Sequence, residues 1–110
     1  MGEGAATVST HVLDTATGRP AAGIRVTLVR LLPDGAAVAA GEGITDADGR
    51  IRALAAAPLV AGDHRLTFHL DGASPFFRRV ELDVRIDDVT RSYHVPLLLA
   101  PYGVTSYRGS

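Results

Sequence analysis

The residues with the clearest chemical capacity lie near the carboxyl end of the sequence. His94 stands in a strongly apolar stretch, residues 93–99, and the sequence closes on Tyr107-Arg108-Gly109-Ser110. A neutral imidazole can take a proton from water near pH 7, whereas a guanidinium stays protonated and can only hold an anion. Because the closing tetrapeptide can donate, accept and carry charge, we expect it to form part of a site.

The elements that must position these residues are β-strands, because apolar and polar residues alternate and no helical period persists. The clearest alternation covers residues 79–87, which have one apolar and one charged face; similar alternation occurs at 8–13, 24–29, 65–70 and 93–99. Turn signals rich in Gly, Asp and Pro separate these runs. The Ala-rich residues 53–61, which include Pro58, are predicted to form a loop. The pattern predicts an all-β sandwich of seven or eight strands in a single domain, residues 1–110, with residues 1–6 disordered.

Strand alternation also predicts which side chains share a face. His11 falls on the opposite face from its apolar neighbours in residues 8–12, and His94 falls opposite the more apolar face of its strand. If the two strands are neighbours, both imidazoles project from the same face, away from the core. On the last strand, a core position for Val104 sends Tyr107 to this face and turns Arg108 away from it.

Composition excludes several classes of function. The 110 residues carry a formal net charge of −1 and no cluster of basic residues, so nucleic acid is a poor candidate partner. Cys is absent, which excludes disulfides and thiolate ligands and fits a reducing compartment. No apolar run approaches the ~20 residues of a membrane span, and no signal peptide precedes the first strand. We therefore expect a soluble cytoplasmic protein, of bacterial origin by its composition, without nucleic-acid or membrane partners.

Several segments together resemble a known enzyme family. Residues 9–14 (Ser-Thr-His-Val-Leu-Asp) followed by residues 17–20 (Thr-Gly-Arg-Pro) are similar to the opening of the transthyretin-like 5-hydroxyisourate hydrolases. Residues 45–50, 93–99 and 107–110 resemble that family's internal Asp-Gly-Arg loop and its closing signature. The resemblance implies a transthyretin-like (prealbumin-like) β-sandwich, assembled as a homotetramer with active sites in a central channel. It implies hydrolytic opening of 5-hydroxyisourate, the unstable product of urate oxidation, without a cofactor.

The same resemblance assigns site residues. The family's functional positions fall on His11, Arg50 and His94, as catalytic residues, and on Tyr107, Arg108, Gly109 and Ser110, as substrate-binding residues. Arg50 would pair with the anionic ring and stabilise oxyanion charge, while His11 and His94 would share the base and proton-donor roles, without a division between them. No nucleophile elbow of the Gly-x-Ser-x-Gly type is present, which favours direct attack by water.

The chain departs from the family pattern between Phe68 and Phe76. Only His69 and residues 70–75 connect them, so the family's usual short helix is expected to be reduced or missing. Arg78 stands where Pro is common, and Val104 where Tyr is frequent. We expect these changes to alter stability or edge geometry rather than to remove the site.

Three alternatives stand beside the hydrolase. Two His suggest a zinc site, but zinc needs three or four ligands and no carboxylate has a suitable spacing; His64 and His69 fall on opposite faces of one strand, so no metal is expected. A tetramer that holds an apolar small ligand without catalysis would suit Leu13, Pro96 and Leu98. A plain accessory sandwich domain explains the middle of the chain but not its two ends.

Overall fold

The fold is all-β. The computed structural model describes residues 6–109; the disorder expected for residues 1–5 and the substrate-binding role expected for Ser110 lie outside this range. The described residues form ten strands: β1 (Val8–Asp14), β2 (Arg19–Pro20), β3 (Arg25–Leu31), β4 (Ala37–Ile44), β5 (Arg50–Ile51), β6 (Gly62–His69), β7 (Arg79–Ile86), β8 (Tyr93–His94), β9 (Leu97–Ala100) and β10 (Gly103–Ser106).

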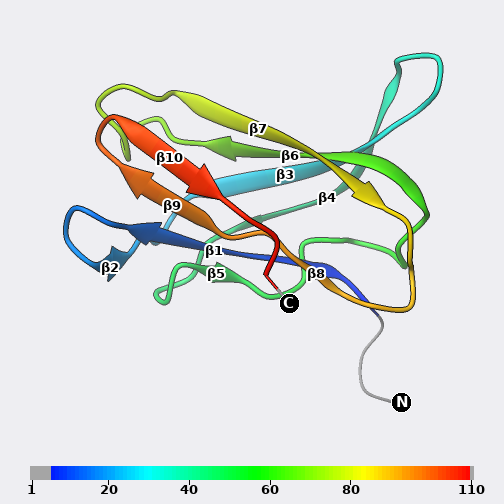
Figure 1. Cartoon of the computed structure of the whole chain (residues 1–110), viewed down its shortest axis with the longest axis horizontal. Coiled ribbons are helices and arrows are strands. Elements are labelled where there is room, and N and C mark those ends of the chain that lie inside the picture. The colour runs from blue at the N-terminus through cyan, green and yellow to red at the C-terminus, as the bar shows by residue number, and fades with distance from the viewer. Residues whose placement is uncertain (1–5, 110) are drawn as a thin grey trace.

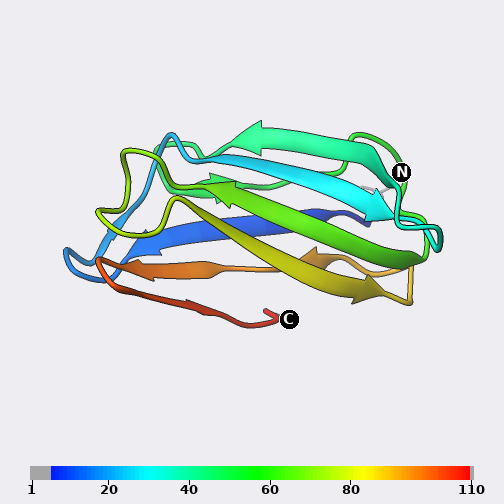
Figure 2. The same ribbon diagram turned by 90° about the horizontal axis from the view of Figure 1, so that it is seen from above.

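The strands form two sheets that pack face to face. One sheet has the order β10-β9-β1-β2, with β5 and β8 also paired to β1; the other has the order β4-β3-β6-β7. Figure 1 views the first sheet from its outer side, and Figure 2 shows the two layers edge-on. This arrangement confirms the predicted β-sandwich class. β1 is the central strand of the first sheet, so residues on β5, β8 and β9 all lie beside it.

The core fills the space between the sheets. Val8 and Val12 of β1 and Leu66 and Phe68 of β6 are each 0% exposed, as the alternation predicts. Each such side chain contributes ~1.5–3 kcal/mol of burial free energy relative to an exposed position. Residues at the odd positions of β1, such as His11, are only partly buried because they face away from this core. Burial of one face of β1 in the core therefore makes the side chains of its other face, including His11, project outward.

The number of strands exceeds the predicted seven or eight because Pro96 interrupts one expected strand. Val8 pairs with Tyr93 and Val12 pairs with Leu97 in the same parallel register, so β8 and β9 form one line beside β1. Proline has no backbone N–H to donate to the ladder. Two further strands, β2 and β5, contain two residues each and follow tight turns.

Residues 53–61 form a loop, as predicted. The Leu54 N–H donates to the Val8 carbonyl at 2.8 Å, and the Ala56 N–H donates to the Ala40 carbonyl at 2.9 Å, so this loop bridges the two sheets. A Cβ atom at Gly41 would overlap the carbonyl oxygen of Leu54. Gly41 is therefore required for the close approach of β4 to the loop.

No helix occurs within residues 6–109, and the segment between β6 and β7 is a series of turns. The Leu70 N–H donates to the Arg78 carbonyl at 2.8 Å, which closes the loop, and Gly72 has a φ of 83°. The expected reduction or loss of the short helix is confirmed for this range. Accordingly, residues 6–109 contain no helix long and apolar enough to cross a membrane.

Candidate active site

Four polar side chains meet on the outer face of β1. His11 is the cross-strand partner of Arg50 on β5, and Ser9 is the partner of His94 on β8. Paired residues in a sheet project to the same side, and Ser9 and His11 are two residues apart on one strand. The register therefore places both imidazoles, the guanidinium and the Ser9 hydroxyl on one face, as alternation predicts for the two His residues.

His94 is held by its neighbours on β1. The Ser9 Oγ and the His94 Nδ1 are 2.8 Å apart, which fixes the ring and leaves Nε2 as its other nitrogen. Partial burial lowers the pKa of His94 from its ordinary value of 6.5, and electrostatic interaction with the neighbouring His11 and Arg50 lowers this pKa further. His94 is consequently neutral at pH 7, the state in which an imidazole can accept a proton.

Arg50 is positioned by the tight turn that precedes β5. The Asp46 Oδ1 accepts hydrogen bonds from the Asp48 N–H at 2.9 Å and the Arg50 N–H at 3.0 Å. The bond from the Arg50 N–H is the main reason that the pKa of Asp46 lies below its ordinary value. Gly49 supplies a φ of 75°, and its carbonyl accepts the Val12 N–H at 2.8 Å. The turn is thus locked onto β1, and it delivers Arg50 opposite His11.

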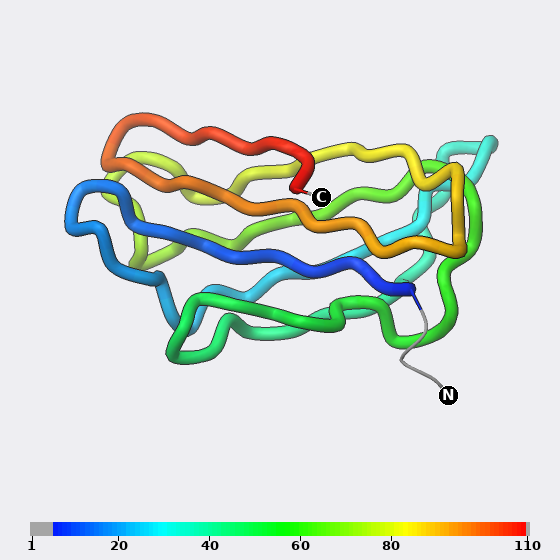
Figure 3. The backbone as a smooth tube through the Cα atoms, turned by 60° about the horizontal axis from the view of Figure 1, so that its bottom comes forward, coloured from blue at the N-terminus to red at the C-terminus, as the bar shows by residue number. Residues whose placement is uncertain are grey.

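The carboxyl end of the chain packs beside His94. Gly109 forms an isolated bridge with His94, and its N–H donates to the His94 carbonyl at 2.8 Å. A Cβ atom at Gly109 would lie 2.5 Å from Cδ2 of the imidazole, closer than side chains tolerate. Figure 3 shows this terminal segment bending back toward the line of β8 and β9. Only glycine fits here, because the backbone itself packs against the ring.

Tyr107 and Arg108 lie elsewhere. Both line a groove of about 360 Å³ at the open edge between β7 and β10, together with Leu82 and Ser106. The Arg108 guanidinium carbon lies 4.7 Å from the centre of the Tyr93 ring, on the opposite side of β8 from His94, as alternation predicts. Tyr107 is 56% exposed and lines the same groove as Arg108, so the prediction that alternation turns it to the His face is wrong, because β10 ends at Ser106 and alternation does not extend beyond it. Gly109, by contrast, contacts His94 directly.

Three of the four polar side chains line a small open cavity of about 180 Å³, and His11 lies outside its lining. Its lining includes Ser9, Arg50 and His94, and adds Arg52, which lies just beyond β5. Residues 6–109 contain no group of three or more His, Asp or Glu that could hold a metal ion. The cluster offers two imidazoles, a hydroxyl and a positive charge, a set suited to activating water beside an anion.

Comparison with known proteins gives the family. Residues 8–109 match the HIUase/Transthyretin family. The chain belongs to this family. It is 39% identical to the 5-hydroxyisourate hydrolase of Deinococcus radiodurans, over 94% of this chain and 95% of that protein. The structure of the Klebsiella pneumoniae 5-hydroxyisourate hydrolase is also 39% identical, with a TM-score of 0.80 over 96% of this chain and 99% of that one.

A family member with a different kind of ligand has the same fold. Sea bream transthyretin in complex with thyroxine is 25% identical, with a TM-score of 0.82 and 93% of each chain covered. These matches confirm the transthyretin-like sandwich and the predicted family. Fold alone does not separate the two activities, because both kinds of relative superpose equally well.

Ser9 is a member of this polar cluster that the sequence did not single out. Alternation placed it on the His11 face, but a Ser in a strand is common and carries no signal by itself. Its partner His94 is 85 residues away in the sequence. Only the parallel register of β1 with β8 brings the two together, and alternation does not specify register between distant strands.

Proposed function

We propose that this chain hydrolyses 5-hydroxyisourate, with His11, Arg50 and His94 as its catalytic residues. Relatives named 5-hydroxyisourate hydrolase match over nearly the whole chain, which supports this substrate. The observation that carries the proposal is the cross-strand register: His11 beside Arg50 and Ser9 beside His94 on one outer face of β1. A plain accessory domain would have no reason to gather these four side chains.

The proposed reaction is a direct attack by water. One imidazole takes a proton from water as the water oxygen adds to a ring carbonyl carbon. The ring C–N bond then breaks, and the departing nitrogen takes a proton from an imidazolium. His11 and His94 share these roles, and the lowered pKa of His94 keeps it neutral and able to accept a proton at pH 7. Positioned general acid–base groups of this kind contribute ~10²–10⁴-fold to rate.

Arg50 would hold the anionic ring and the charge that develops on the attacked oxygen. Its guanidinium presents a planar fork of donors and cannot itself remove a proton. The Asp46–Gly49 turn fixes its backbone before the substrate arrives, so little reorganisation is needed. The terminal tetrapeptide is proposed to contribute to substrate binding through Gly109, which packs on His94, and through Ser110. Tyr107 and Arg108 line the separate groove beside β7, so they are proposed to contribute at a site that a second protomer completes.

Ser9 is proposed as a positioning residue for His94. Its hydroxyl holds Nδ1 at 2.8 Å, so the ring turns Nε2 toward the reacting groups and keeps a single tautomer. Gly109 packs against the opposite part of the same ring. Together these contacts hold the imidazole on two sides.

We also propose a homotetramer that acts in the bacterial cytoplasm. The cavity of about 180 Å³ is open and smaller than the ~300–1,000 Å³ of most small-molecule sites, which fits a site completed by a second protomer. The relatives with the hydrolase name include bacterial proteins, and a chain without Cys suits a reducing compartment. Light scattering tests the assembly: a monomer at working concentration contradicts it.

The second candidate is a binding protein that holds a small apolar ligand, as the thyroxine complex of sea bream transthyretin suggests. The imidazoles and guanidinium on the β1 face disfavour an apolar ligand at that place. Freshly generated 5-hydroxyisourate separates the two functions. We expect its ultraviolet absorbance to decay much faster with the protein, whereas an unchanged decay favours the binder.

A further inference from the structure

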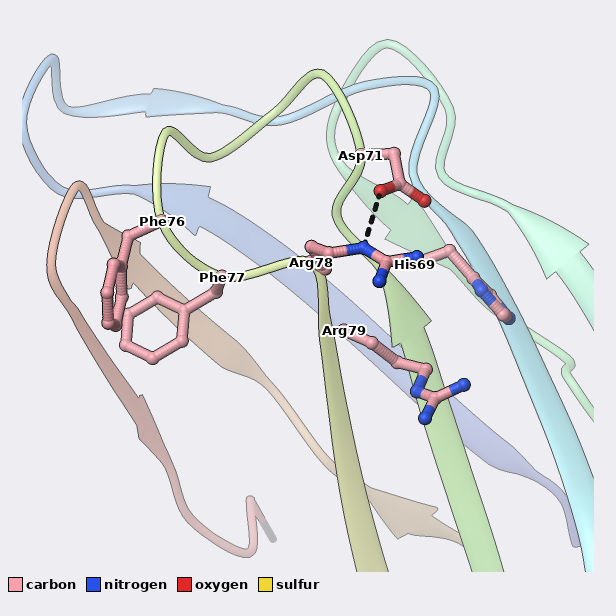
Figure 4. Close-up of a pocket in the computed structure, with 6 residues that line it drawn as sticks. All are labelled: His69, Asp71, Phe76, Phe77, Arg78 and Arg79. Carbon is pink, nitrogen blue, oxygen red and sulfur yellow. Dashed lines mark ion pairs between the residues drawn. The ribbon is translucent and has the colours of Figure 1, made fainter.

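A second cavity lies on the other sheet, beside the turns that connect β6 to β7. It measures about 410 Å³ and is lined by His69, Asp71, Phe76, Phe77, Arg78 and Arg79. Figure 4 shows the three basic side chains on one side of the loop and the two phenyl rings on the other. The volume falls in the range of small-molecule sites, ~300–1,000 Å³. The cavity shares no residue with the proposed active site.

Basic residues line up across the sheet at this point. His69 on β6 is the cross-strand partner of both Arg25 on β3 and Arg79 on β7. All three project from the outer face, because Phe68, the neighbour of His69, points into the core. The row places a guanidinium group on each side of His69, so an anion bound there would interact favourably with them.

The carboxylates near this row satisfy only part of it: Nη2 of Arg25 donates to Oε1 of Glu42 at 3.3 Å, whereas the arginines that line the cavity have longer ion pairs. Nε of Arg78 lies 3.7 Å from Oδ1 of Asp71, and Nε of Arg79 lies 3.9 Å from Oε2 of Glu81. Both distances exceed the range of a hydrogen bond. The Arg78 and Arg79 side chains are 89% and 61% exposed, so their donors are available to a ligand.

The imidazole of His69 has an unsatisfied atom. Its Nε2 is buried and has no hydrogen-bond partner among residues 6–109. Buried polar atoms are paired in the large majority of cases, so this atom calls for an acceptor or donor that the chain itself does not supply. A ligand oxygen that enters the cavity lined by His69 can fill that role.

We propose that this cavity binds a small oxyanion, a phosphate monoester or a dicarboxylate. Arg78 and Arg79 present guanidinium forks to its oxygens, and the Nε2–H of His69 donates a third hydrogen bond. Planar forks of this kind match phosphate and carboxylate geometry. The site is independent of the proposed hydrolase, since its residues lie on β6, β7 and their connection.

The test is a titration of the full chain with inorganic phosphate and, separately, with succinate, followed by NMR. Ionic strength is held constant with sodium chloride, and the signals are the His69 imidazole nitrogens and the arginine Nε–H groups. The double variant Arg78→Ala/Arg79→Ala removes both forks. Arg85→Ala is the matched control, because Arg85 lies on the same face of β7, ~20 Å away, with an equally long 3.9 Å ion pair to Asp63.

We expect saturable shifts at His69, with an affinity at least about tenfold weaker in the double variant and unchanged in Arg85→Ala. A response to phosphate alone identifies a phosphate ligand, and a response to succinate alone identifies a dicarboxylate; either supports the site. Shifts that never saturate, no shifts at His69, or an equal loss in Arg85→Ala overturn it. Because binding is measured without substrate, failure of the hydrolase proposal does not affect the result.

Discussion

The arginines on the two sheets are satisfied in different ways. Arg65 on β6 donates through Nε and Nη2 to both oxygens of Asp83, at 2.6 and 2.9 Å, and this bond holds the pKa of Asp83 below its ordinary value. Arg50 on β5 takes part in no ion pair within residues 6–109. Arg65 thus belongs to a completed surface pair, whereas Arg50 has charge to offer a ligand.

The difference shows what positions a functional side chain. Arg65 is held by its own head group, which leaves nothing for a substrate. Arg50 is held by its backbone, through the Asp46 and Gly49 turn that docks on β1, so its guanidinium stays available. Arg78 and Arg79, which line the second cavity, lie between these cases, because their ion pairs are long.

The largest expected effect is at the two imidazoles on the β1 face. His11→Ala and His94→Ala should each slow hydrolysis of 5-hydroxyisourate by ~10²–10⁴-fold without unfolding the protein, because each removes a group that moves a proton. His69→Ala, on the other sheet, should retain the wild-type rate. Rates are followed by ultraviolet absorbance and folding by circular dichroism. Wild-type rates in either site variant remove that residue from the mechanism.

The next largest effect is expected at Arg50, and it should differ from the effect of the same change at Arg65. Arg50→Ala should lose ~10²–10³-fold in rate, since it removes a donor that stabilises oxyanion charge, and should leave the melting temperature almost unchanged. Arg65→Ala should retain the rate and lower the melting temperature slightly. If both variants lose rate equally, the distinction between a completed pair and an available cation is wrong.

A smaller loss is expected where the chain packs on His94. Gly109→Ala should reduce the rate about tenfold, because the new methyl group displaces the ring from its position, and ~1 Å displacements near a site are costly. Gly103→Ala is the control, since a Cβ there has no atom within 4 Å. Equal activity of the two variants would show that Gly109 does not constrain the imidazole.

Ser9→Ala should have a still smaller effect, a few-fold decrease in kcat with little change in KM. The His94 ring loses the hydrogen bond that orients it but can still transfer a proton. Ser9→Thr, which keeps the hydroxyl, should restore most of the rate. Nitrogen NMR of His94 gives an independent readout: one tautomer in the wild type and a mixture in Ser9→Ala. An unchanged tautomer balance contradicts the positioning role.

The pH dependence follows from the lowered pKa of His94. The ring of His94 binds a proton less readily in the folded state than in the unfolded state. The contribution of His94 to the free energy of unfolding is therefore present above pH 6.5 and is lost as the pH falls below 6.5 through the folded-state pKa. The acid limb of kcat/KM should likewise lie below 6.5. His94→Gln should abolish this part of the pH dependence of unfolding; an acid limb above 6.5 contradicts the assignment.

Much of the fold could be predicted from the alternation of apolar and polar residues, because this alternation shows which side chains are buried. It gave the faces of β1 and β7 and the common direction of His11 and His94. It did not reveal β4, whose Ala and Gly residues carry no contrast between faces and whose position depends on Gly41 meeting the 53–61 loop. It also treated residues 93–99 as one strand, although Pro96 divides them into β8 and β9.

The candidate site was predictable only in part, and the limit is register. Alternation cannot tell that His11 lies opposite Arg50, since that pairing depends on the docking of the Gly49 turn onto Val12. It cannot tell that Ser9 meets His94, since that contact spans most of the chain. The family resemblance supplied Arg50 as a candidate, and the cross-strand pairing supplies the physical reason for its place.

The most direct test of this account is the decay of freshly generated 5-hydroxyisourate, measured side by side with the wild type, His94→Ala and His69→Ala. The account predicts fast decay with the wild type and His69→Ala, and a rate near the spontaneous one with His94→Ala. Decay at the spontaneous rate with the wild type, or at the wild-type rate with His94→Ala, would contradict the claim that the β1 face is the hydrolytic site.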